Sequence, residues 1–242
     1  MSDTWTITKR ELRSYFLSPI AYVVGALFLG IGAYMFFQIV FIEAGRAAEA
    51  RMDAYFGRLP MFFLVLVPAL AMRLWSEERK LGTIELLLTF PVRTGSLIMG
   101  KFLGALLFLS VLMLLTLIYP ITLAALGDLD WGPVIGGYLG ALLLAAAYLS
   151  LGLFVSSTTQ DQIIALIVSV VVLLLLYYLP GIAAFFLPPA LIDTVMLASP
   201  VVHFQSIARG VLDLSDVIYY VVFCAFFLFL NHVTIEVRKW AG

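Results

Sequence analysis

The chain has 242 residues, of which 63% are apolar and only 12% are charged, whereas a soluble domain is about 45–50% apolar and about 25% charged. This composition excludes an ordinary water-soluble fold and predicts that most of the chain faces lipid. The net charge of −1 provides no bulk field that would recruit nucleic acid, and the single cysteine, Cys224, cannot form an internal disulfide.

The N-terminal stretch predicts a helix at the membrane interface, over residues 3–18. At about 100° per residue its apolar face excludes the charged side chains, and that face holds Trp5, Thr8, Leu12, Tyr15 and Phe16. A solvated N-terminal extension is the alternative. Because this stretch is charged and has no apolar core, we expect no cleavable signal peptide.

Uncharged stretches of membrane-spanning length follow. A helix needs about 20 apolar residues to cross the hydrocarbon core. Five stretches meet this requirement and are predicted as spans: 19–42, 101–126, 132–156, 162–187 and 217–236. A further segment, 57–75, has a shorter uncharged part than the other spans, because Leu59 to Met72 lies between Arg58 and Arg73. It spans if these arginines snorkel to the interfaces; otherwise it is buried or re-entrant and the chain has five spans.

The basic residues are distributed unevenly between the two sides of the membrane. With six spans and both termini cytoplasmic, most Lys and Arg residues lie inside, as the positive-inside rule requires. A five-span arrangement with the N-terminus outside gives the same balance, so charge alone does not decide. We therefore expect an all-α, multi-pass integral membrane protein with a single domain over 1–242, in which segment 57–75 decides the number of spans.

The most informative polar stretch follows segment 57–75. It consists of Glu77-Glu78-Arg79-Lys80-Leu81-Gly82-Thr83-Ile84-Glu85-Leu86-Leu87-Leu88-Thr89-Phe90-Pro91. The charges end a membrane helix, Gly82 suits a left-handed C-cap, and Thr83 suits the N-cap of a new helix that Pro91 ends. This helix, predicted over 83–91, cannot expose its leucines to water. It therefore docks either on its own bundle or into a groove of a partner.

This run resembles the cytoplasmic signature of type-2 ABC exporter permeases, in which it forms the coupling helix that sits in a cleft of the ATP-binding subunit. The layout of nearly the whole chain is similar to that family. The segment before the last span resembles the permeases related to gliding-motility and nitrous-oxide-reductase-maturation transporters, and it consists of Ser199-Pro200-Val201-Val202-His203-Phe204, then Arg209-Gly210-Val211-Leu212-Asp213, and finally Asp216.

The resemblance implies roles for individual residues. The residues that dock on the partner ATPase would be Glu77, Glu78, Arg79, Gly82, Thr83 and Glu85. Short re-entrant helices within 188–214 would cap the outer mouth, and the candidate outer gate there comprises Pro200, His203, Phe204, Arg209 and Gly210. For His203 a hydrogen-bonded surface group is the alternative to a ligand. No cofactor is expected in this chain, because ATP and magnesium would be bound by the partner subunit.

Two glycine patterns need separate interpretations. Residues 95–101 have the spacing of a phosphate-binding loop, but Phe102 stands where Ser or Thr should follow the lysine, and no strand precedes the run. We therefore interpret it as the start of a span. Two small-xxx-small pairs, Gly100 with Gly104 and Gly136 with Gly140, predict close helix approach.

What the spans lack also bears on function. Their apolar stretches at 19–42, 102–126, 132–156 and 162–187 hold no charged residue, which disfavours a proton- or sodium-driven carrier or channel. No zinc-protease motif or nucleophile elbow supports an intramembrane hydrolase.

The resemblance and these exclusions together imply a transport subunit without enzyme activity of its own. The expected protein is the permease of an ABC exporter in a bacterial or archaeal cytoplasmic (inner) membrane, with both termini cytoplasmic. It would work as a dimer of permeases with two ATPase subunits, exporting a substrate or doing mechanical work on a periplasmic or accessory membrane protein. No nucleic acid partner is expected. The alternative is a membrane scaffold or assembly factor without a transport cycle.

Overall fold

The computed structural model describes residues 3–43, 52–85, 92–186 and 188–241, and these residues form helices and turns without any strand. The helices are α1 (Asp3–Leu17), α2 (Pro19–Phe37) with a π-helical turn (Gln38–Glu43), α3 (Asp53–Ala71), α4 (Arg73–Lys80), α6 (Thr94–Leu115), α7 (Ile118–Leu126), α8 (Trp131–Thr158), α9 (Gln162–Phe186), α10 (Pro189–Met196), α11 (Pro200–Ala208) and α12 (Leu214–Ala241). The predicted all-α fold is therefore confirmed.

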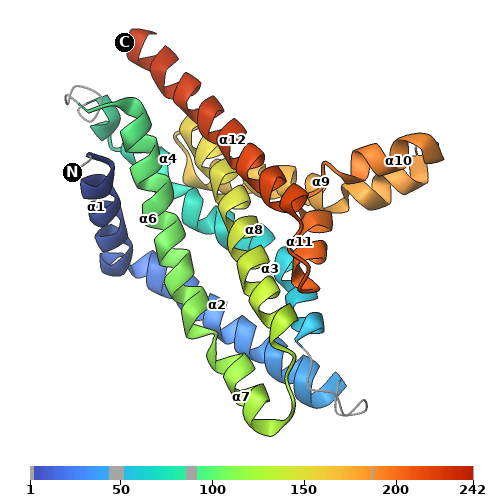
Figure 1. The fold of residues 1–242 in the computed structure, drawn as a ribbon. Coiled ribbons are helices and arrows are strands. Elements are labelled where there is room, and N and C mark those ends of the chain that lie inside the picture. Colours follow the sequence, from blue (N-terminus) through green and yellow to red (C-terminus); the bar gives the residue numbers. More distant parts are fainter. Residues whose placement is uncertain (1–2, 44–51, 86–91, 187, 242) are drawn as a thin grey trace.

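Six helical segments of the described chain are long and apolar enough to cross a membrane. They are Pro19–Phe37, Asp53–Lys80, Thr94–Leu126, Trp131–Thr158, Gln162–Phe186 and Leu214–Lys239. The doubtful second segment is thus among the candidates, because α3 and α4 follow each other almost without interruption and extend well beyond the uncharged residues. Both chain ends lie at the end of the bundle where α6 begins (Figure 1), as an even number of crossings requires.

Helix α8 forms the centre of the bundle and packs against α3, α6, α9, α11 and α12. Small residues on α8 let these neighbours approach closely; a Cβ added at Gly152 would lie 2.6 Å from the Cβ of Ala71. By contrast, α9 and α12 leave most of their apolar side chains exposed, which suits surfaces covered by lipid or by another protein chain. Helix α10 and the end of α9 extend away from the other helices (Figure 1).

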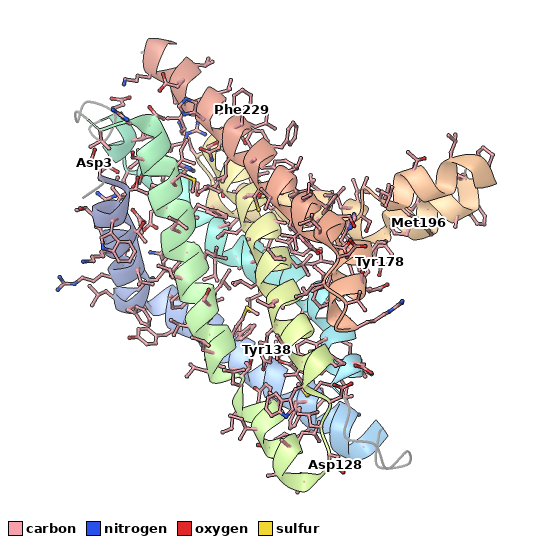
Figure 2. All side chains as sticks on the ribbon, in the orientation of Figure 1. Asp3, Asp128, Tyr138, Tyr178, Met196 and Phe229 are labelled. Carbon is pink, nitrogen blue, oxygen red and sulfur yellow. The ribbon has the colours of Figure 1, made fainter. Side chains whose placement is uncertain are left out.

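Polar atoms concentrate at the two ends of the bundle, near Asp3 and near Asp128, while the side chains between them are mainly carbon (Figure 2). Aromatic residues of α2, α3 and α7 fill the end opposite α4. There the ring of Phe36 stacks on Tyr119 at 4.9 Å, and the Tyr119 hydroxyl donates a hydrogen bond to the Leu29 carbonyl. These contacts tie the second half of α2 to the core.

Helix α1 packs along the first half of α6, and glycine makes the approach possible. A Cβ added at Gly100 would lie 2.5 Å from Ile7 Cγ2, and one added at Gly104 would lie 2.7 Å from Glu11 Cβ. The close approach predicted for this glycine pair is therefore confirmed, and the helix that approaches is α1.

The predicted apolar face of α1 divides between the bundle and the surface. Thr8 and Tyr15 are buried against the bundle, whereas Trp5 and Phe16 remain 43% and 42% exposed, and the position of this face at a membrane interface stays a prediction. Glu11, which the prediction places off the apolar face, is buried as well. The packed face is rotated toward Glu11 because this carboxylate meets a buried lysine of α6.

Candidate docking site at the α4 end of the bundle

Helix α4 begins without a cap of its own, since the Met72 side chain at its N-cap position offers no acceptor. Ser156 near the end of α8 supplies the cap. Its Oγ accepts hydrogen bonds from the backbone N–H groups of Trp75 and Ser76, each at 3.1 Å, and donates to the Met72 carbonyl at 2.8 Å. The first N–H groups of any helix have no partner within the helix, and here the hydroxyl of Ser156, about eighty positions away in the sequence, accepts from two of them. This contact fastens α4 to α8.

Lys101, in the second turn of α6, joins α4 to α1. Its Nζ lies 2.8 Å from Glu78 Oε1 and 3.3 Å from Glu11 Oε1, and it sits 5.1 Å from the centre of the Trp75 ring. Lys101 is only 2% exposed. A lysine so far from water is stable only with charged partners, and the two carboxylates on separate helices provide them.

The electrostatics of Glu11 follow from this pairing. Burial of the Glu11 carboxyl acts to raise its pKa, but the charges and hydrogen bonds of Lys101 and Arg10 outweigh burial and hold the pKa below its usual value. Glu11 is therefore a carboxylate at neutral pH, and we call Glu11, Lys101 and Glu78 the charge triad.

Arg73 and Tyr15 make a second link between α4 and α1. Arg73 Nε lies 3.3 Å from Glu77 Oε2, its guanidinium sits over the Tyr15 ring, and it donates a hydrogen bond to the Ser18 hydroxyl. The Tyr15 hydroxyl in turn donates to the Leu70 carbonyl at 3.1 Å, and burial raises the pKa of this phenol. The turn between α1 and α2 is thereby held against the junction of α3 and α4.

The chain changes direction after α4 at a glycine, Gly82. Arg79 donates a hydrogen bond to the Ser157 carbonyl at 3.0 Å, the helix ends at Lys80, and Gly82 follows with φ +69°. This left-handed conformation is the one predicted for a C-cap glycine. Thr83 differs from its predicted N-cap role, because it is already helical and its hydroxyl donates to the Glu78 carbonyl at 3.2 Å.

The predicted coupling helix over 83–91 lies partly outside the described residues. Thr83, Ile84 and Glu85 are helical, Ile84 is buried and Glu85 is exposed, whereas 86–91 are not described. The helix as a whole stays a prediction. The described start of this segment lies beside a cavity of about 420 Å³ between α1 and α4. The cavity is lined mainly by charged side chains of α1, α4 and α6, and its other lining residues include Ser14, Leu74, Leu81 and Thr83.

The second group of predicted site residues lies apart from the first, on α11. Pro200 begins this helix, Phe204 is fully buried, Arg209 is exposed at its end, and Gly210 follows with φ +86°. His203 is hydrogen-bonded, but it is buried rather than at the surface. Two short helices, α10 and α11, therefore occupy the segment predicted as re-entrant; their placement in a membrane stays a prediction.

The second glycine pair makes room for α11. A Cβ added at Gly136 would lie 2.3 Å from the Ile207 carbonyl oxygen, and one at Gly140 would lie 3.2 Å from the Ile207 and Phe204 side chains. A Cβ at Gly210 would meet the backbone of Gly132 at 3.0 Å. Helix α11 is thus pressed onto the first half of α8, as the small-residue pair predicts.

The run with the spacing of a phosphate-binding loop is helical in the structure. The run 95–101 lies within α6, so its amide groups belong to a helix and not to a phosphate-binding loop. Within the described ranges, no group of three or more His, Cys, Asp or Glu side chains could hold a metal ion.

Sequence reasoning missed three residues of the α4 site: Glu11, Lys101 and Ser156. A usable signal existed for Lys101, because it is a single charge between the apolar residues Met99 and Phe102. Such a lysine within a helix requires an acidic partner nearby. No comparable signal identified Ser156, since small hydroxyl residues are common at helix ends.

Comparisons with known proteins add an independent finding. A family model described as "ABC-2 family transporter protein" matches residues 5–235 of the chain. The chain is also 28% identical to the probable ABC transporter permease protein NosY of Pseudomonas aeruginosa, over 67% of this chain and 62% of that protein. It therefore spans less than two thirds of the length of this relative.

Proposed function

Because the chain belongs to the ABC-2 family of transporter proteins, we propose that it is the permease subunit of an ATP-driven ABC exporter. In this function a separate ATPase subunit binds ATP and magnesium, and this chain converts the motion of that subunit into export or into mechanical work across the membrane. The similarity to a probable ABC transporter permease supports the proposal.

The observation that carries the proposal furthest is the attachment of α4. The charged run that precedes the predicted coupling helix is fixed to α8 through Ser156, to α6 through Lys101 and to α1 through Glu11. A segment that receives force from a partner must be coupled stiffly to the spans it moves. These contacts supply that stiffness, whereas a loop that only covers the bundle would not need them.

The same contacts define a path for the motion. When the partner ATPases close on ATP, the two coupling helices would move together, and α4 would move with them as one body. The load would pass through the charge triad to α1 and α6 and through Ser156 to α8. The path therefore includes α8, the fourth candidate span.

This function implies an orientation in the membrane and a set of partners. The α4 end of the bundle, with both termini, would face the cytoplasm, and α10 and α11 would lie toward the outside of a bacterial or archaeal inner membrane. A second permease copy would complete the transport unit, and the exposed apolar faces of α9 and α12 are available for it. No catalytic group is assigned to this chain.

A charge reversal at Glu85 tests the docking role. Glu85 is exposed, whereas Glu77 and Glu78 pair with Arg73 and Lys101, so reversing either of those would also disturb the fold. We expect Glu85→Lys to reduce the ATPase recovered with the tagged chain by about tenfold or more, because a like-charge contact at an interface costs several kcal/mol and about 1.4 kcal/mol already changes affinity tenfold.

The matched control is Asp128→Lys, an exposed reversal at the opposite end of the bundle (Figure 2). It should leave the recovered ATPase unchanged. If Glu85→Lys also retains the ATPase in full, the docking role of this segment is refuted. If the chain functions in cells without any ATPase, the scaffold function replaces the proposed one.

A further inference from the structure

The turn between α10 and α11 is held by three aromatic side chains that donate hydrogen bonds to its carbonyl groups. His203 Nε2 lies 2.9 Å from the Leu197 carbonyl, the Tyr219 hydroxyl donates to Ala198 at 2.7 Å, and the Tyr220 hydroxyl donates to Pro200 at 2.6 Å. Two of these donors belong to the first turns of α12. The turn is thus clamped onto α12 by its backbone.

The histidine of this clamp faces an acceptor on both sides of its ring. Besides the carbonyl at Nε2, its Nδ1 lies 2.6 Å from Asp216 Oδ1, and the ring stacks on Tyr219 with a centroid distance of 4.0 Å. A carbonyl oxygen can only accept a hydrogen bond, and imidazole is more basic than a carboxylate. Both contacts are therefore satisfied together when both ring nitrogens carry protons.

Burial strengthens this requirement. The side chains of His203 and Asp216 are each only 8% exposed, and Asp216 Oδ2 has no hydrogen-bond partner among the described residues. A neutral ring would leave the carboxylate charged, buried and without a cation, which is strongly unfavourable. The pair is stable as an imidazolium beside a carboxylate.

The other titratable groups around the ring do not replace this charge. From α12 the ring faces Asp216 and Tyr219, with Tyr220 next to them. From α8 the phenol of Tyr148 interacts electrostatically with Tyr219 and Tyr220, and from α9 the phenol of Tyr177 interacts with Tyr148. Arg209, on α11 itself, is exposed at the far end of the helix. Phenols stay neutral near neutral pH, so the tyrosines keep their donors and the His203 ring is the member of the clamp that can lose one.

We infer that His203 is held as an imidazolium whose second proton latches the turn Leu197–Pro200 onto the start of α12, and that loss of this proton releases the α10–α11 segment. The direction follows from the geometry: the latch is closed while both ring nitrogens hold protons, and it opens when one of these protons is lost. Because α11 is also pressed onto α8 at Gly136 and Gly140, release begins at the turn and at α10. This inference does not depend on a partner ATPase.

Nitrogen NMR of labelled histidine tests the protonation directly. The chain has two histidines, so the His232→Gln variant in lipid nanodiscs leaves the signal of His203 alone. At about pH 7.5, where an exposed imidazole is about nine-tenths neutral, we expect both ring nitrogens of His203 to be protonated. In the same background Asp216→Asn should give a neutral ring. A neutral His203 in the chain that retains Asp216 overturns the inference.

Hydrogen exchange tests the release. After correction for the intrinsic effect of pH, exchange of the amides in the α10–α11 turn should rise with pH by up to about tenfold per pH unit, since opening is linked to the loss of one proton. His203→Gln should exchange fast and independently of pH. The latch is refuted if the corrected exchange rate of the unmodified chain does not change with pH, or if it rises equally in His203→Gln. If His203→Gln does not fold, the pH dependence of exchange in the unmodified chain and the NMR result still test the latch.

Discussion

Removal of the Lys101 charge is the most informative perturbation of the α4 site. The substitution Lys101→Met keeps a long unbranched side chain and leaves Glu11 and Glu78 without their shared cation. Their side chains are 12% and 20% exposed. Removing one partner of a buried ion pair costs about 3–5 kcal/mol, because the remaining charge stays in a poorly hydrated place.

The expected cost lies near the lower end of this range. Arg10 remains 2.9 Å from Glu11, but it is about half exposed, and pairs of that kind contribute no more than about 1 kcal/mol. Glu78 regains some hydration because it borders the cavity. We therefore expect a loss of about 3 kcal/mol in the free energy of unfolding, equivalent to a factor of more than about one hundred in the equilibrium constant.

The assay is reversible unfolding of the purified chain in mixed micelles, followed by tryptophan fluorescence. The matched control is Lys80→Met, which makes the same change at an exposed lysine. Its free energy of unfolding should stay within about 0.5 kcal/mol of that of the parent chain. The triple variant Glu11→Gln, Lys101→Met, Glu78→Gln removes all three charges, and it should recover most of the stability because no unpaired charge remains. A single Lys101→Met variant as stable as the Lys80→Met control would refute the structural role of the charge triad.

Three further predictions concern single contacts. Ser156→Ala removes the cap of α4 and should lower the free energy of unfolding by about 1–2 kcal/mol; Ser110→Ala, whose hydroxyl bonds only within its own helix, should cost less than half of that in the same denaturation assay. Gly136→Ala places a Cβ 2.3 Å from a backbone oxygen of α11 and should lower the free energy of unfolding by about 1–3 kcal/mol. Gly30→Ala, with open space around the added Cβ, should not destabilise the chain. Equal melting temperatures for the two variants would contradict the close packing of α11 on α8. The pKa of Glu11 is lowered in the folded chain, so its contribution to stability is present above its unfolded pKa of about 4.3 and is lost as pH falls through the folded value. Glu11→Gln should remove this part of the acid destabilisation, measured as the unfolding free energy between about pH 3 and pH 6.

The spans and several turns were predictable because they depend on local patterns. Long uncharged stretches require helices that cross a membrane, a glycine after a charged helix end suits a left-handed turn, and small residues four apart allow close approach. Gly82 and the pair Gly136 with Gly140 fulfil these roles in the structure. Each of these inferences uses only residues that are neighbours in the sequence.

The contacts of the candidate site were not predictable in the same way, because they join distant residues. A hydropathy pattern places the end of a span at its first charged residue, so it predicts Lys101 at the start of a span. In the structure α6 begins earlier, at Thr94, and Lys101 is buried within it. Likewise the second candidate span, Asp53–Lys80, extends beyond the predicted segment 57–75 into the charged residues Glu77 to Lys80. A charge that finds a partner on another helix does not end a helix, and a single sequence does not identify that partner.

The central claim is that this chain transmits the work of a separate ATPase. The most direct test is affinity purification of the tagged chain from its native membranes under gentle conditions, with quantification of every protein that is recovered. The account predicts that a P-loop ATPase is recovered in near-equal amount with the permease. Recovery of the chain alone, or only with proteins that bind no nucleotide, would contradict it.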